Sequence, residues 1–144
     1  MPTPDEIRAE LASARDELAA ALSAAPADTW ERKPESGEGE DAWSAREAAQ
    51  HVVGAELYYT NAVCEACGYD GPESPFAGGL EFASPADAGT ALTQAIAAAD
   101  SKIQHVSEGD LGKSHERMGP MPDVFESWTG HLRDHAAQIT AAGS

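Results

Sequence analysis

The stretch "WSAREAAQHVVGAE", residues 43–56, predicts the beginning of an amphipathic helix. Ser44 fits the N-cap position. Glu47, three residues later, completes a capping box, in which side chains bind free backbone N–H groups of the first turn. Apolar residues then recur at helical spacing, and His51 lies at the edge of the face that they form. A single histidine on such a face is usually structural, so the role of His51 depends on whether other histidines reach the same point.

Three further amphipathic segments follow the same pattern, and together they predict an all-α protein. Four helices of about 20 residues each are expected, with N-cap residues Thr3, Ser44, Ser84 and Asp123. Each helix carries a stripe of apolar side chains that must be buried against the other helices. We therefore predict a four-helix bundle, formed as one domain by residues 1–144.

The composition excludes several classes of partner. The 144 residues include 25 acidic and 9 basic side chains, and the formal net charge of -16 repels nucleic-acid phosphates and anionic lipid surfaces. The apolar fraction of 42% argues against a disordered chain. No apolar run approaches the roughly 20 residues that span a membrane, and the acidic N-terminus lacks a signal-peptide pattern. We expect a cytoplasmic protein that binds neither nucleic acid nor membrane.

A second motif, "HLRDH" at residues 131–135, supplies two more histidines. His131 and His135 are four residues apart, so their imidazoles share one helix face, about 6 Å apart at Cβ, and can bind one metal ion. His51 is the candidate third ligand. If the bundle alternates up and down, the second and fourth helices start at the same end and the histidines lie at similar depth. A connection at residues 68–83 that crosses the bundle would alter this alignment.

The other titratable residues near these motifs have simpler interpretations. Glu47, Glu56 and Asp134 are close to the histidines in sequence, but each is expected to be solvated or to cap a helix. Asp134 has a second interpretation, as a group that orients a ligand histidine. We expect His105 and His115 to be surface residues, with a place beside the metal as the alternative for His115. No general acid or base is apparent.

The two cysteines form the motif "CEAC", which is similar to redox and zinc-binding motifs. A redox pair gains from a helix N-terminus, where the dipole stabilises thiolate, whereas Cys64 and Cys67 lie near a predicted C-terminus. Cys64 also lies 13 residues after His51, which is about 20 Å along a helix. We expect the cysteines to be independent of the histidine site.

The combined motifs resemble those of the DinB-like helical bundles, also called YfiT-like metalloenzymes. The resemblance covers nearly the whole chain and rests on WS-x-RE-x-x-x-H in residues 43–51 and H-x-x-x-H in residues 131–135. It implies a four-helix bundle, often dimeric, in which His51, His131 and His135 hold a divalent metal ion. Imidazole ligands suit Zn²⁺ or Ni²⁺.

The resemblance also implies a class of reaction. Family members with an assigned activity include mycothiol-dependent maleylpyruvate isomerases and low-molecular-weight-thiol transferases. Three imidazoles leave open positions on a metal ion, where a thiol or water loses its proton and becomes a nucleophile. We therefore expect a metal-dependent thiol transferase or isomerase that uses a thiol cosubstrate and a small-molecule substrate. A homodimer is the assembly that the resemblance implies. The alternative is a non-catalytic bundle that binds a small molecule or a protein partner.

An up-and-down bundle further predicts where substrate enters. It places the connections 26–43 and 109–122 at the end of the bundle nearest the histidines. The connections contain Trp30, Met118 and Met121, together with His115, and such groups can line a pocket. Glycines give residues 109–122 the freedom to act as a partial lid; the alternative is a plain connector.

Overall fold

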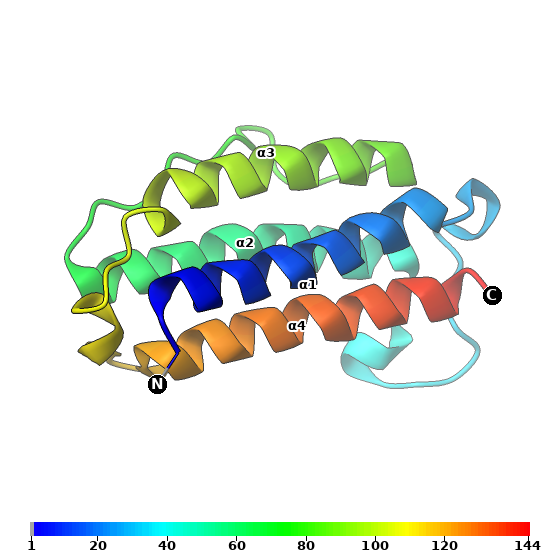
Figure 1. Cartoon of the computed structure of the whole chain (residues 1–144). Coiled ribbons are helices and arrows are strands. Elements are labelled where there is room, and N and C mark those ends of the chain that lie inside the picture. Colours follow the sequence, from blue (N-terminus) through cyan, green and yellow to red (C-terminus); the bar gives the residue numbers. More distant parts are fainter. Residues whose placement is uncertain (1) are drawn as a thin grey trace.

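Four long helices packed side by side make up the protein in the computed structural model, which describes residues 2–144 (Figure 1). The helices are α1 (Pro4–Ala24), α2 (Ala45–Cys67), α3 (Pro85–Ile103) and α4 (Met121–Ala142). The connections contain 3-10 turns η1 (Ala27–Thr29), η2 (Gly39–Ala42) and η3 (Asp110–Gly112), and the short antiparallel strands β1 (Ser114–His115) and β2 (Gly119–Pro120). The prediction of an all-α four-helix bundle is confirmed. Over residues 2–144, no helix is long and apolar enough to cross a membrane.

Capping residues predicted from the sequence begin three of the helices. Thr3 accepts a hydrogen bond from Glu6 N–H, and the Glu6 carboxylate accepts one in return from Thr3 N–H. Ser44 and Glu47 form the same reciprocal pair at the start of α2. Ser84 caps α3 through its hydroxyl oxygen. These boundaries were predictable because each depends on residues within one helical turn.

The predicted N-cap of α4 at Asp123 is wrong, because the helix begins two residues earlier at Met121. The hairpin of β1 and β2 leads the chain into α4, and Met121 N–H donates to the carbonyl oxygen of Lys113 (2.9 Å). Pro122 lies in the first turn, where its fixed φ is already helical and its missing N–H would have had no partner. Asp123 therefore lies inside the first turn, where its charge complements the helix dipole.

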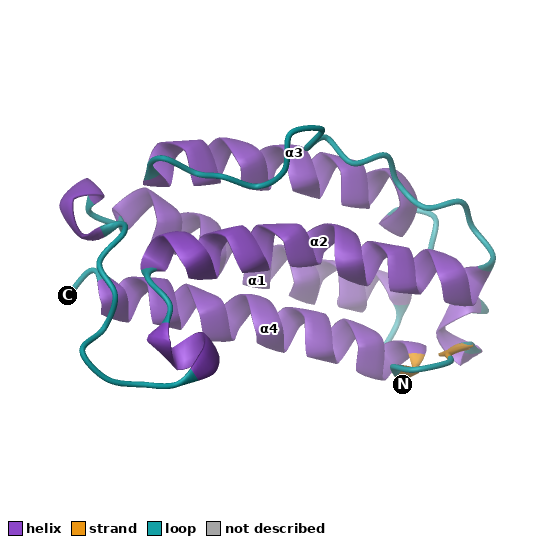
Figure 2. Ribbon diagram, turned by 180° about the vertical axis from the view of Figure 1, so that it is seen from behind, coloured by secondary structure: helices purple, strands orange, loops and turns teal. Residues whose placement is uncertain are grey.

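The connection at residues 68–83 runs back along the whole bundle, so the bundle does not simply alternate up and down. Figure 2 shows this segment returning beside α3, and α2 and α3 consequently run in the same direction. Phe82, near its end, donates its N–H to the side chain of Gln50, close to the start of α2 (3.0 Å). α2 and α4 are antiparallel, since Tyr59 contacts Ser127 whereas the earlier His51 contacts a later residue of α4.

Chain length explains why this crossover is possible. Sixteen extended residues reach about 50 Å, whereas a 23-residue helix such as α2 is about 35 Å long. Trp30 fixes the far end of the crossover, because its buried indole N–H donates to the carbonyl oxygen of Phe82 (2.8 Å). Leu80 packs closely on α2 at Gly54, where an added Cβ would lie 2.8 Å from the Leu80 methyl group.

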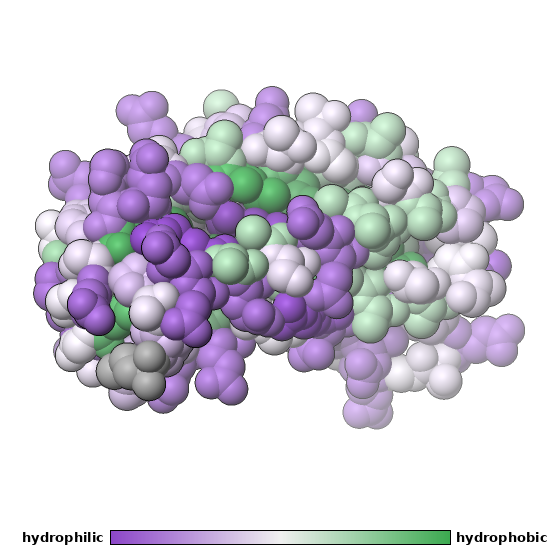
Figure 3. All heavy atoms as spheres, viewed as in Figure 1, coloured by the Kyte–Doolittle hydropathy of each residue, from purple (hydrophilic) through white to green (hydrophobic). Residues whose placement is uncertain are grey.

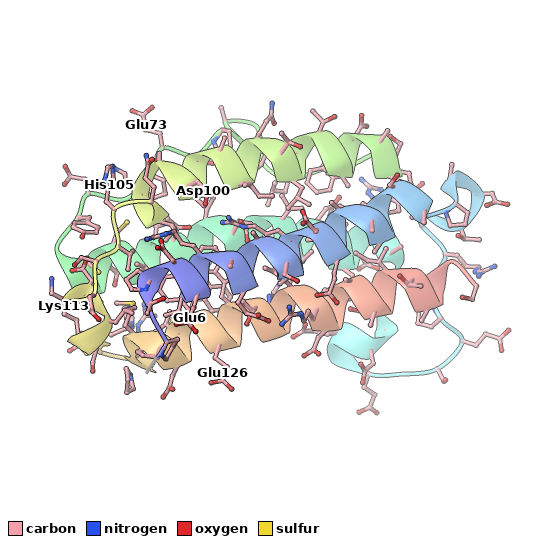
Figure 4. All side chains as sticks on the ribbon, viewed as in Figure 1. Glu6, Glu73, Asp100, His105, Lys113 and Glu126 are labelled. Carbon is pink, nitrogen blue, oxygen red and sulfur yellow. The ribbon has the colours of Figure 1, made fainter. Side chains whose placement is uncertain are left out.

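The core combines apolar side chains with one polar cluster that joins all four helices. Hydrophilic residues cover much of the molecular face in Figure 3, as the net charge requires. Inside, the guanidinium of Arg15 on α1 lies 2.7 Å from the Glu56 carboxylate on α2. Arg15 also lies 2.8 Å from Asp100, a residue of α3 labelled in Figure 4. Trp128 on α4 donates its indole N–H to the second oxygen of Glu56 (2.7 Å).

The expectation that Glu56 is solvated or caps a helix is wrong, because its side chain is completely buried. Burial raises the pKa of Glu56, while the charge of Arg15 and the hydrogen bond from Trp128 oppose that rise. A buried carboxylate needs partners of this kind. They come from other helices, which is why the sequence around Glu56 did not reveal its environment.

We predict that Glu56→Ala lowers the free energy of unfolding by about 3–5 kcal/mol, because it leaves the buried Arg15 charge without its main partner. Urea denaturation followed by circular dichroism measures this change. The double variant Arg15→Met/Glu56→Leu removes both charges and is expected to be more stable than Glu56→Ala. A single variant within about 1 kcal/mol of the original protein would contradict the prediction.

Candidate metal centre

The structure brings His51, His131 and His135 together at one point between α2 and α4. The Nε2 atoms of His51 and His131 are 3.0 Å apart. The ring centroid of His135 lies 5.1 Å from that of His51 and 4.5 Å from that of His131. Three imidazoles from two helices thus surround one small volume, and one ring nitrogen of each lies within 4.8 Å of the others.

The histidines meet through an arrangement different from the expected one. His51 lies six residues after the start of α2, and His135 lies seven residues before the end of α4. At 1.5 Å per residue these positions are about 9 Å and 11 Å from the two helix ends. Because α2 and α4 are antiparallel, those ends lie at the same end of the bundle, as Figure 1 shows.

A fourth donor, Glu40, comes from η2 and was not identified from the sequence. Its Oε1 atom lies 3.1 Å from His135 Nε2 and 4.0 Å from His51 Nε2. One ligand atom from each of the four residues lies within 4.8 Å of the others, so the group could hold a metal ion. Glu40 is one of several acids in a segment without helical periodicity, and no spacing rule singles it out.

Gln138 holds two members of this group in place. Its Oε1 lies 2.7 Å from His135 Nδ1, which is the geometry for accepting that N–H and directing the Nε2 lone pair inward. Its Nε2 donates to the main-chain carbonyl oxygen of Glu40 (2.5 Å). The suggestion that Asp134 orients a ligand histidine is wrong: Asp134 is exposed, and Gln138 makes this contact one turn from His135.

The electrostatics of the site suit a cation. Burial, together with the neighbouring histidines, lowers the pKa of His131 to about 4. Burial and then His135 lower the pKa of His51, which Glu40 partly opposes. Imidazoles held in this way are neutral near pH 7 and keep lone pairs available. Several lone pairs and a carboxylate directed at one point repel one another unless a shared proton or a metal ion lies between them. The types of donor, imidazole and carboxylate, fit a divalent metal.

A cavity of about 320 Å³ adjoins the donor group. It is lined by His51, Gly54, Ala55, Tyr58, Tyr59 and His131. Because neither Glu40 nor His135 belongs to this lining, the cavity reaches the donors from the side of His51 and His131. Tyr59 is fixed by stacking on Trp128, with ring centroids 5.7 Å apart, whereas 54% of the Tyr58 surface is exposed. The cavity can therefore offer aromatic surface to an organic ligand beside the metal position.

Residues 109–122 lie at the opposite end of the bundle, so the predicted lid over the histidines is wrong. Lys113 donates to the carbonyl oxygen of Cys67, at the end of α2 farthest from His51. The long crossover before α3 reverses the direction expected for α3 and α4, and so moves residues 109–122 to the other end of the bundle. The connection that does reach the site is the one before α2, because Trp43 packs 4.9 Å from His51 between ring centroids.

His115 belongs to this distant connection and is buried, which corrects its prediction as a surface residue. Its Nδ1 accepts hydrogen bonds from the N–H groups of Arg117 and Met118, and its Nε2 contacts Glu65 (3.1 Å). It therefore stabilises the turn between β1 and β2. His105 is exposed, as predicted, and Figure 4 shows it at the surface beyond the end of α3.

The position and the environment of the two cysteines both make their thiols poor nucleophiles. Cys64 is buried and Cys67 is half-buried near the C-terminus of α2. Burial raises the pKa of both thiols, and for Cys67, where Asp110 adds to the effect, the pKa rises to about 11. Thiols with such pKa values are poor nucleophiles at neutral pH.

Comparison with known proteins identifies the family. The sequence model of the DinB superfamily matches residues 10–139, a range that contains all four donor residues and most of the bundle. A search of curated proteins and a search of solved structures returned no significant match. The match covers well over half of the chain, so this protein belongs to the DinB superfamily, and the resemblance seen in the sequence is confirmed.

We predict that replacing Cys64 and Cys67 with serine leaves the metal content unchanged. The reason is their separation from His51 along α2, about 20 Å for the nearer cysteine. Elemental analysis of the Cys64→Ser/Cys67→Ser variant, purified beside the original protein, makes the measurement. Loss of stoichiometric metal from a variant that remains folded would show that a cysteine contributes to the site.

Proposed function

We propose that this protein binds a divalent metal ion through His51, His131 and His135 and acts as a thiol-dependent transferase or isomerase on a small molecule. The convergence of the three imidazoles beside an aromatic-lined cavity carries this proposal. Membership of the DinB superfamily supports metal binding. Zn²⁺ and Ni²⁺ are the ions that suit neutral imidazoles best in such a site.

The proposed chemistry divides between the ion and the chain. When bound, the metal would supply acidity, lowering the pKa of a thiol or water at an open position. The chain supplies orientation: α2 and α4 fix the imidazoles, and Gln138 fixes the tautomer of His135. Tyr58 and Tyr59 provide a surface for the organic part of a thiol or substrate. The Trp43 ring packs against those of His51 and His135, with centroids 4.9 Å and 6.1 Å away.

A non-catalytic metal-binding bundle is the second candidate function. Glu40 favours it, because three imidazoles and one carboxylate complete a four-coordinate shell of the kind found in closed structural sites. An open position, or one that a small thiol can take, distinguishes the enzyme from this alternative.

Replacing any one of His51, His131 or His135 with alanine removes one of the three imidazole ligands. Each variant is therefore expected to bind Zn²⁺ at least about 10–100-fold more weakly. His105→Ala is the matched control, since this histidine is exposed and distant from the site. Protein prepared without an affinity tag is titrated with Zn²⁺ in a calorimeter. Equal affinity in the control and in all three site variants would disprove the proposed metal site.

The cavity generates a separate prediction about the organic ligand. Tyr58→Ala is expected to weaken binding of benzyl mercaptan to the Co²⁺-substituted protein about fivefold, because an exposed aromatic wall is lost. Binding of 2-mercaptoethanol, which has no ring, is expected to be unchanged. Thiolate-to-cobalt absorption measures both. An equal effect on the two thiols, or none on either, would show that the cavity does not hold the thiol substituent.

A further inference from the structure

We infer that Glu40 is an exchangeable fourth metal ligand, a carboxylate that occupies the last position of the shell and gives way to an incoming anionic ligand such as a thiolate. The inference rests on the proposed metal site and adds to it a function for the connection between α1 and α2. Its basis is the contrast between three donors held on packed helices and one donor held on a short exposed turn.

The position of Glu40 fits a ligand. In a tetrahedral zinc shell with bonds of about 2.1 Å, neighbouring ligand atoms are about 3.4 Å apart. Glu40 Oε1 lies 3.1 Å from His135 Nε2 and 4.0 Å from His51 Nε2, and the separation of the His51 and His131 Nε2 atoms is 3.0 Å, so these distances lie on both sides of this value. The carboxylate oxygen therefore takes the place of a fourth ligand around the same centre.

The main chain around Glu40 is built to present this side chain. Gly39, immediately before it, has a φ of +58°, and Gly37 has a φ of +123°. Both values lie in the region that favours glycine. An added Cβ at Gly37 would also lie 2.8 Å from the carbonyl oxygen of Asp41. The sequence "GEGE" at residues 37–40 thus turns the chain so that Glu40 faces the histidines.

Two hydrogen bonds anchor the backbone of Glu40 while its side chain stays exchangeable. The Glu40 carbonyl oxygen accepts from Gln138 Nε2 (2.5 Å) and from Trp43 N–H (3.2 Å). The carboxylate is 57% exposed, and among the described residues its ion-pair contacts are with His51 and His135 and with no lysine or arginine. Rotation about the side-chain bonds can therefore withdraw the carboxylate without moving η2.

The position of the cavity indicates the side from which a ligand that replaces Glu40 would enter. The aromatic-lined cavity reaches the donors beside His51 and His131, whereas Glu40 approaches beside His135. A ligand entering from the cavity meets the shell from a side that Glu40 does not fill. A thiolate arriving there would add to the shell as Glu40 leaves, so the net charge of the donor set is unchanged by the exchange.

The test uses Co²⁺ in the protein of residues 1–144, because the visible absorption of Co²⁺ reports its ligands and coordination number. Glu40→Gln and Glu40→Ala are compared with Glu38→Gln, a matched control two residues away on the same exposed segment. We expect both Glu40 variants to change the absorption spectrum and to weaken Co²⁺ binding about tenfold or more, whereas Glu38→Gln behaves like the original protein. Gly39→Ala, which strains the turn but keeps the carboxylate, is expected to weaken Co²⁺ binding in the same direction.

Titration with 2-mercaptoethanol tests the exchange itself. Since the Glu40→Ala variant has no carboxylate to displace, its Co²⁺ form is expected to bind the thiol more tightly than the original protein does. His135→Ala separates the two proposals. If the histidine variant loses Co²⁺ but the Glu40 variants match Glu38→Gln in spectrum and affinity, the metal site stands and the inference about Glu40 is wrong. Weaker Co²⁺ binding by the Glu40 variants without tighter thiol binding would leave Glu40 a fixed ligand and overturn exchange. If the original protein binds no Co²⁺, both proposals fail.

Discussion

The hydrogen bond from Trp128 to buried Glu56 sets how α2 and α4 lie against each other, and the histidine cluster depends on that register. Glu56 follows His51 by five residues on α2, and Trp128 precedes His131 by three on α4, so the polar contact lies about one to two turns from the donors. Apolar packing is not directional, so by itself it tolerates small sliding between two helices. A buried carboxylate with directional partners does not, because each displaced partner leaves an unsatisfied polar group. Stability and site geometry are thus coupled through the same pair of helices.

The convergence of the histidines could be anticipated from the sequence even though the assumed topology was wrong. His131 lies ten residues after the start of α4 and eleven before its end, so its depth in the bundle hardly depends on the direction of the helix. His135, one turn further on, does depend on direction, and the antiparallel arrangement brings it toward the start of α2, where Glu40 and Gln138 also lie. The position of the predicted lid, by contrast, depends strongly on the direction of α4. Reversing α4 moved residues 109–122 to the other end of the bundle.

What the sequence revealed and what it concealed follow the range of the interactions. The capping boxes of Thr3 and Ser44 involve residues three positions apart, and their residue types alone identify them. Glu56, by contrast, has its buried partners on two other helices, and His115 is buried in a hairpin whose strands are two residues long. Neither environment leaves a periodic signal. Glu40 is hidden for another reason: its position depends on the left-handed backbone at Gly39 and on a contact from Gln138, 98 residues away in sequence.

The division of donors between helices and a connecting turn separates two properties that a metal enzyme must combine. Imidazoles on packed helices are preorganised, so they provide affinity with little loss of side-chain entropy. A carboxylate on an exposed turn can occupy the remaining position and leave it without disturbing the core.

The acidic surface also influences which ligands reach the site. A net charge of -16 raises the local concentration of cations and disfavours anions that are not bound directly by the metal. Under the proposed function, a thiol that approaches as the neutral species through the apolar cavity would avoid this repulsion, and it would release its proton only where the metal charge compensates the resulting anion. For this protein the choice between enzyme and closed metal site therefore turns on whether Glu40 stays in place when a thiol enters.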